Sequence, residues 1–313
     1  YGDLTQGEII ALINYMTQIL NAMVVFANLL VTFTKASASA SRINEVLAVK
    51  PSMVEGAGAE FNENEPAIRL DDVTFRYEGN VSPSLEHVTL SVNKGDSVGI
   101  LGGTGCGKTT LISLMTRLYD ATEGKVYVFG NDIKDYADAQ LYGLFGVAPQ
   151  KAVLFSGTVR ENMQWGKPDA TDEEIEKALV VSQSKEFVDN LKGRLDFVVA
   201  QDGKNLSGGQ RQRLTIARAL VSQPEILILD DSSSALDFAT DANLRKALNA
   251  LRAERKLTTV TVSQRATSIK YCDLIVVLDD GKIVGQGTHE ELINSCEVYR
   301  EICLSQNKEE EVK

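Results

Sequence analysis

The sequence has little of what builds disulfide scaffolds, zinc sites or nucleic-acid-binding surfaces. Its four cysteines form no C-x-x-C pair and no zinc-type spacing, so we expect reduced thiols in a cytosolic compartment. The formal net charge is −11, whereas a protein that binds DNA or RNA needs a basic face to neutralise phosphates. A nucleic acid is therefore not expected as the main partner. The only two histidines, His87 and His289, stand in no catalytic pattern.

Charge is missing altogether from residues 9–34. A stretch of this length can cross the hydrocarbon core of a bilayer, for which about 20 apolar residues suffice. Lys35, Arg42 and Lys50 all follow it, which predicts that its C-terminal end lies in the cytoplasm. Acidic residues before the stretch do not fit a signal peptide. We therefore predict a transmembrane helix, with a buried helix of a soluble domain as the alternative, because several asparagines, threonines and a glutamine interrupt the apolar run.

Composition divides the chain into four parts. Residues 1–50 hold the membrane helix and its extension, which we expect to end at Pro51. Residues 51–66 are rich in Gly, Glu, Asn and Pro and are predicted to be a linker. Residues 67–308 form the main domain, and residues 309–313 are an acidic tail. The sequence begins with Tyr1 rather than methionine, so we expect a fragment of a longer protein.

The main domain alternates strand and helix signals, as in an α/β fold. Residues 68–77 alternate like a strand, whereas residues 97–101 and 226–229 are short apolar runs typical of buried parallel strands. Capping boxes at Thr171 and Thr288 predict two helix starts. Residues 279–281 read Asp-Asp-Gly between two apolar segments, which predicts a hairpin turn.

A glycine-rich loop follows the strand expected at residues 97–101 and matches G-x-x-x-x-G-K-[ST] in full. Backbone N–H groups of such a loop can approach phosphate oxygens, and the following helix adds its N-terminal dipole. Lys108 would reach the β and γ phosphates, and Thr109 would bind Mg²⁺. The candidate phosphate-binding residues are Gly102, Gly103, Thr104, Gly105, Cys106, Gly107, Lys108, Thr109 and Thr110.

Two further signals belong with a phosphate loop. Asp230 ends the apolar run of residues 226–229 and offers a carboxylate that holds a metal ion, usually through water. Downstream, the sequence reads Leu206-Ser207-Gly208-Gly209-Gln210 before a helix expected at residues 211–220. Its hydroxyl and N–H donors would form a second anion site. One nucleotide cannot readily use both sites within a single chain.

With these motifs the chain resembles the nucleotide-binding domain of an ABC transporter over residues 67–306. In that family two such domains face each other, and the signature of one closes on the ATP held by the other. Tyr77 resembles the aromatic residue that stacks on adenine, and Gln150 the glutamine that touches the metal and relays nucleotide state to the membrane. Residues 154–162 are similar to an exporter segment, and residues 234–237 to the loop that crosses the dimer interface.

The resemblance implies a P-loop ABC ATPase fold with an antiparallel β subdomain and a helical subdomain. It implies ATP and Mg²⁺ as cofactors, with the metal at Thr109, Gln150 and Asp230. The helix in residues 1–50 resembles the last helix of an exporter's membrane domain. The expected location is therefore the cell membrane, multi-pass in the full-length protein, with the nucleotide-binding domain on the cytoplasmic side. The expected partners are a second half-transporter subunit, the lipid bilayer and an exported substrate that the sequence does not identify.

Two catalytic positions depart from the family pattern. Asp231 stands where a glutamate orients the attacking water, and its carboxylate is one methylene short. A misplacement of about 1 Å can cost on the order of a hundredfold in rate. Gln264 stands where the family commonly has a switch histidine; its amide can hydrogen-bond a phosphate but cannot carry a proton.

These departures resemble the degenerate-site subunit of a heterodimeric bacterial multidrug-type exporter. The hypothesis is an ATPase that binds ATP tightly, hydrolyses it weakly at its own loop, and acts through Ser207, Gly208, Gly209 and Gln210 on its partner's nucleotide. A homodimeric exporter with a slow but working site is the nearest alternative. A soluble ABC-type ATPase acting on nucleic acid or ribosomes is an alternative of another class. The membrane helix and the acidic composition argue against that class.

Overall fold

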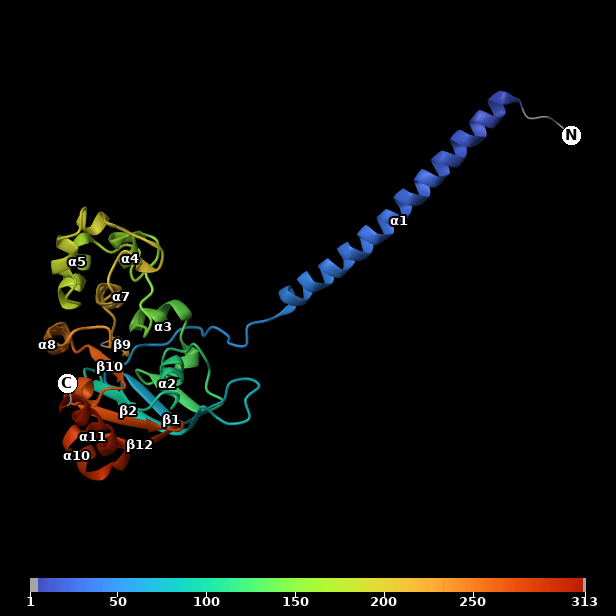
Figure 1. The fold of residues 1–313 in the computed structure, drawn as a ribbon. Coiled ribbons are helices and arrows are strands. Elements are labelled where there is room, and N and C mark those ends of the chain that lie inside the picture. The colour runs from blue at the N-terminus through green and yellow to red at the C-terminus, as the bar shows by residue number, and fades with distance from the viewer. Residues whose placement is uncertain (1–4, 233, 312–313) are drawn as a thin grey trace. The chain divides into compact units, whose positions relative to one another are not determined.

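The computed structural model describes residues 5–232 and 234–311, with side chains as far as residue 306. Contacts divide the chain into two compact units after Val54, and each unit is described by itself (Figure 1).

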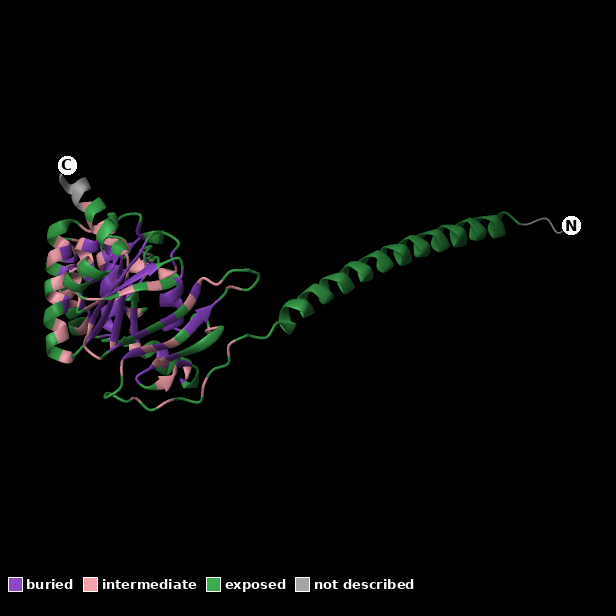
Figure 2. Cartoon of the chain, turned by 90° about the horizontal axis from the view of Figure 1, so that it is seen from below, coloured by how far each residue is buried: buried purple, intermediate pink, exposed green. Residues whose placement is uncertain are grey.

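The first unit contains one long helix, α1 (Gln6–Ala48), which begins with a capping box between Thr5 and Glu8. None of its residues is buried (Figure 2). It is the one helix in the described part of the chain that is long and apolar enough to cross a membrane. The hydroxyls of Thr17, Thr32 and Thr34 donate to carbonyls four residues earlier in the same helix. The predicted helix is thus present and ends at Ala48, just before the expected end at Pro51. Its apolar surface needs lipid or other helices to cover it.

The second unit is built on two sheets. The four-stranded antiparallel sheet has the order β2-β1-β4-β5 and the six-stranded sheet the order β12-β11-β3-β10-β9-β6. The first sheet comprises β1 (Ile68–Phe75), β2 (Leu85–Val92), β4 (Glu123–Val128) and β5 (Asn131–Asp132). The second comprises β3 (Ser97–Leu101), β6 (Phe145–Ala148), β9 (Ile226–Asp230), β10 (Thr258–Ser263), β11 (Leu274–Asp279) and β12 (Lys282–Gly287). A small ribbon pairs β7 (Gly157–Thr158) with β8 (Val198–Val199).

The helices of this unit confirm most of the expected starts. Thr171 and Thr288 both cap helices through complete capping boxes. The helix expected from residue 211 begins earlier, at Gly208, because Ser207 is its N-cap. The helices are α2 (Lys108–Met115), α3 (Asp138–Leu144), α4 (Val159–Gln164), α5 (Asp172–Val181), α6 (Lys185–Asp189), α7 (Gly208–Val221), α8 (Phe238–Arg255), α9 (Ala266–Ile269), α10 (His289–Ser295) and α11 (Glu297–Glu311). Short 3₁₀ turns are η1 (Ile133–Asp135), η2 (Arg194–Asp196) and η3 (Gln201–Gly203).

The predicted α/β fold is confirmed, with an antiparallel sheet, a six-stranded sheet whose strands are all parallel except the edge strand β12, and a helical part built on α4 to α7. All five residues of β3 are buried, as are the first four of β9. Val262 of β10 pairs with Ile100 of β3 on one side and with Asp230 of β9 on the other. The carboxyl ends of the three strands therefore lie together at one edge of the sheet.

Residues 55–61, in the predicted linker, belong to the second unit and are hydrogen-bonded within it. Gly56 N donates to Tyr136 O (3.1 Å) and Gly58 N to Asp135 O (3.0 Å). The Gln140 side chain exchanges two hydrogen bonds with the backbone of Ala59. This segment therefore packs beside η1 and α3, directly upstream of β6.

Gly146 offers a test of the packing between β6 and α7. A Cβ at this position would lie 2.3 Å from Ala219 O and 2.7 Å from Pro224 Cγ. We expect Gly146→Ala to lower the thermal unfolding midpoint of the detergent-solubilised protein by about 5 °C, because the helix must move away. Gly143→Ala is the matched control, since nothing lies within 4 Å of its added Cβ in α3. Equal midpoints for the two variants would contradict the close approach.

Candidate nucleotide-binding site

A cavity of about 570 Å³ opens at the edge of the sheet where β3, β9 and β10 end. This volume lies in the range of small-molecule sites. The cavity brings together most of the predicted binding and catalytic residues: Tyr77, Thr104, Gly105, Gly107, Lys108, Thr109, Thr110, Gln150, Asp230, Asp231 and Gln264. Its lining also includes six residues that the sequence interpretation missed: Asn80, Ser82, Pro83, Ser84, Asp280 and Gly281.

The glycine loop connects β3 to α2 with two left-handed glycines. Gly105 has φ 84°, and Gly107, the N-cap of α2, has φ 105°. A Cβ on Gly107 would also lie 2.8 Å from Leu85 Cδ2, so glycine is required there on both counts. Lys108 Nζ donates to Gly102 O (2.8 Å) and Gly103 O (2.5 Å).

Three predicted loop residues, Gly102, Gly103 and Cys106, do not line the cavity. Cys106 is only 6% exposed, and a Cβ on Gly102 would lie 2.5 Å from its Sγ. Gly281 N donates to Cys106 O (3.1 Å). The turn of the predicted β11–β12 hairpin is therefore hydrogen-bonded to the glycine loop. This contact places Asp280 and Gly281 at the cavity.

Two adjacent carboxylates end β9. Burial raises the pKa of Asp230 above its ordinary value; the Asp231 carboxylate adds to this rise and Lys108 opposes it. Asp231 has φ 44°, a left-handed conformation that Asp tolerates better than most residues. Its N–H donates to Val262 O (2.9 Å), and Gln150 Nε2 lies 3.4 Å from Asp231 Oδ2. Hydroxyl, amide and carboxylate oxygens of Thr109, Gln150 and Asp230 thus line one cavity and form a donor set that suits Mg²⁺.

Tyr77 belongs to a cluster of three aromatic rings. Its ring packs edge-on against Phe75 (centroids 4.8 Å apart, 85°) and against Tyr119 (5.2 Å, 88°). Its hydroxyl lies 3.2 Å from Thr110 Oγ1 in α2. The ring is therefore held at the cavity beside the first turn of α2.

The motif of residues 206–210 does not line this cavity. Ser207 Oγ accepts from Gln210 N (3.2 Å), and Gln210 Oε1 accepts from Ser207 N (2.9 Å), so the two side chains cap α7 reciprocally. Nothing in the described chain lies within 4 Å of a Cβ built on Gly208, whereas one on Gly209 would lie 3.2 Å from Ala235 O. The start of α7 thus has open space at Gly208.

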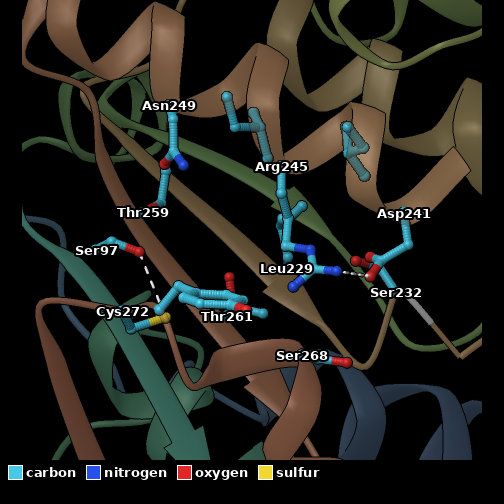
Figure 3. Close-up of a pocket in the computed structure, with 13 residues that line it drawn as sticks. Ser97, Leu229, Ser232, Asp241, Arg245, Asn249, Thr259, Thr261, Ser268 and Cys272 are labelled. Atoms are coloured by element: carbon cyan, nitrogen blue, oxygen red, sulfur yellow. Dashed lines mark hydrogen bonds and ion pairs between the residues drawn. The ribbon is translucent and has the colours of Figure 1, made fainter. Parts of the chain in front are cut away.

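A second, small cavity of about 60 Å³ lies beside α8 and α9 (Figure 3). Its lining includes Ser232, which follows Asp231, as well as Asp241 and Arg245 of α8 and Ser268 of α9. Arg245 pairs with the buried carboxylate of Asp241 (3.0 Å). The cavity therefore joins the segment after β9 to the segment that follows Gln264.

A separate groove of about 490 Å³ lies beside α4, α7 and β6. Phe155 and Trp165 pack together there, with ring centroids 4.6 Å apart. Trp165 is nevertheless 66% exposed, so this groove presents aromatic surface to its surroundings.

Comparison with known proteins identifies the family. Residues 85–234 match the model of the family described as ABC transporter. The chain carries the nucleotide-binding domain of an ABC transporter. It is similar to a solved bacterial Atm1-family ABC exporter with ATP bound, at 29% identity and a TM-score of 0.85, covering 97% of this chain and 53% of that one.

Curated relatives show the same relationship. The uncharacterized ABC transporter ATP-binding protein YfiB of Bacillus subtilis is 39% identical over 305 residues, which are 97% of this chain and 52% of that protein. A Staphylococcus aureus protein named as a candidate multidrug export ATP-binding/permease protein is 41% identical over 253 residues, or 80% of this chain and 43% of that protein. The chain spans about half the length of the curated relatives it matches.

The aromatic cluster leads to a prediction about base binding. If the Tyr77 ring stacks on adenine, Tyr77→Ala should weaken ATP binding about tenfold, because stacking of a base on an aromatic ring contributes about 1–3 kcal/mol. Tyr77→Phe keeps the ring and loses only the contact with Thr110, so its affinity should stay within about twofold of the parent. Equilibrium binding of a fluorescent ATP analogue measures both. Equal losses in the two variants would show that the hydroxyl matters rather than the ring.

Proposed function

We propose that this chain is the ATP-binding part of a dimeric ABC exporter subunit, with a site that holds ATP and hydrolyses it slowly. The observation that carries the proposal is the composition of the 570 Å³ cavity. There the glycine loop, Gln150 and Asp230 meet Asp231 and Gln264, the two residues that depart from the family pattern. The residues expected to bind phosphate and metal are thus all of the usual types, whereas the two residues expected to act in hydrolysis differ from the family pattern.

The holding function follows from charge and geometry. Backbone N–H groups of the loop and the N-terminus of α2 favour phosphate oxygens, and Lys108 would turn from the loop carbonyls to the β and γ phosphates. Thr109, Gln150 and Asp230 would hold Mg²⁺, which supplies positive charge to the phosphates and offsets the repulsion between Asp230 and Asp231. Tyr77 would bind the base.

The slow hydrolysis follows from two side chains. Asp231 would act as the general base toward water, but its carboxylate stops one methylene short of the glutamate it replaces. Gln264 would donate a hydrogen bond to the γ phosphate without carrying a positive charge. Both side chains keep the site polar, so binding is preserved while the rate falls.

The need for a second subunit is inferred from the separation of the phosphate loop and the signature motif at residues 207–210. Residues 207–210 lie outside the cavity, and open space adjoins Gly208. We infer that this end of α7 closes on ATP bound by a second half-transporter subunit, and that a heterodimer supplies a competent site there. The exposed apolar surface of α1 and the export and permease names of relatives support a place in the cell membrane, in a multi-pass protein. Lys35, Arg42 and Lys50, which follow the uncharged stretch, support a nucleotide-binding domain in the cytoplasm.

Restoring the family residues tests the degenerate site. Asp231→Glu combined with Gln264→His should raise the ATPase rate of this chain's own site by about 10- to 100-fold. The longer glutamate side chain brings the carboxylate to the attacking water, and histidine, unlike glutamine, can carry a proton and a positive charge at the γ phosphate. The rate is measured as phosphate release from the purified protein in nanodiscs. The same pair with Lys108→Ala added is the control and should show no gain. A rate unchanged by the double restoration would refute the degenerate site.

Gly208 tests the role of the signature. Gly208→Ala should leave the unfolding midpoint unchanged, because the added Cβ meets nothing in this chain. It should lower ATP turnover of the assembled transporter at least tenfold, because the methyl group enters space meant for the partner's nucleotide. Gly143→Ala is the matched control. If the purified complex contains only this chain and still turns over ATP, the homodimer replaces the heterodimer.

A further inference from the structure

The C-terminal helix α11 contacts the backbone at the switch position, Gln264, and two residues after it. Gln306 Nε2 donates to Gln264 O (2.7 Å), and Gln306 Oε1 accepts from Ala266 N (2.9 Å). One side chain thus binds the carbonyl of residue 264 and the N–H of residue 266. Such a pair of bonds fixes both position and orientation of the segment between them.

α11 is anchored firmly enough to serve as a support. Tyr299 is fully buried, and its hydroxyl lies 2.7 Å from His289 Nδ1 of α10. Ile302 and Cys303 pack against the core cluster that contains Ala266 and Ile269 of α9. Gln306 lies four residues after Ile302 and so on the same face of the helix.

The switch segment is also held from α8. Arg245 NH1 lies 3.4 Å from Thr267 O, and the guanidinium is itself paired with Asp241 at the 60 Å³ cavity (Figure 3). Arg265 N donates to Ser263 Oγ (2.9 Å). The backbone of residues 263–267 is therefore bonded from two helices, while the exposed Gln264 lines the nucleotide cavity.

We propose that Gln306 is a positioning residue for Gln264. By holding the Gln264 carbonyl and the Ala266 N–H, it fixes the Gln264 side-chain amide where it meets the terminal phosphate of ATP. The inference rests on the proposed role of Gln264. Because ADP lacks that phosphate, Gln306 contributes to the preference for ATP over ADP and not to nucleotide affinity in general.

The test is the ratio of ATP to ADP affinity in the nanodisc-embedded protein, measured with Mg²⁺. Gln306→Ala removes both hydrogen bonds and should weaken ATP binding about tenfold while ADP binding stays within about twofold. Gln306→Glu keeps the acceptor for Ala266 but sets a carboxylate against the Gln264 carbonyl, so it should also lower the ratio. Ser305→Ala is the matched control, because Ser305 Oγ bonds Ile302 O within α11. It should match the parent.

A double-variant cycle shows whether Gln306 acts through Gln264. Gln264→Ala should lower the ATP-to-ADP ratio by itself, and adding Gln306→Ala should then change nothing further. Additive losses, or parallel losses of ATP and ADP affinity, would overturn the proposal and leave Gln306 a structural residue. If Gln264→Ala leaves the ratio unchanged, the role of Gln264 in the proposed function fails and the positioning role fails with it. If Gln264→Ala lowers the ratio and Gln306→Ala does not, only the positioning role fails.

Discussion

The register of three parallel strands is the constraint on which the nucleotide site depends. Val262 lies opposite both Ile100 and Asp230, so the glycine loop, the paired carboxylates and the switch segment emerge from one edge of the sheet. A shift of one residue in β9 would turn Asp230 toward the opposite face. The continuous burial of β3 and β9 prevents such a shift, because the apolar side chains on both faces are already packed. The core of the sheet thus sets the spacing of groups that themselves contribute little to stability.

Features that depend on neighbouring residues were predictable from the sequence. The apolar run at residues 97–101 coincides with β3, because a short continuous run before a glycine loop admits few other structures. The capping boxes at Thr171 and Thr288 and the hairpin at residues 279–281 were confirmed for the same reason: the caps and the turn act within a few residues. The gathering of Tyr77, Gln150 and Asp230 came from family resemblance, since nothing local links them.

Features that depend on packing between distant segments were not predictable. Gln306 contacts Gln264 across 42 residues, and this pairing depends on the packing of Tyr299, Ile302 and Cys303, which fixes the path of α11. The left-handed backbone of Asp231 gives no sequence signal, because Asp occurs in both left-handed and ordinary conformations along this chain. Residues 55–61 have the composition of a linker, yet their backbone groups find partners in η1 and α3. Composition indicates that such a segment forms no regular helix or strand, but its position depends on the hydrogen-bond partners that distant residues provide.

Trp165 gives the protein an internal optical reporter. It is the only tryptophan in the sequence, and it stands largely exposed against Phe155 in the groove beside α4 and α7. Indole emission depends on contact with water, so the tryptophan fluorescence of this chain reports on this one place. Whatever covers the groove, whether another part of the full-length protein or a second subunit, changes the emission spectrum directly. Coverage of this groove by a segment that itself lacks tryptophan can therefore be followed in real time without adding a dye or a cysteine.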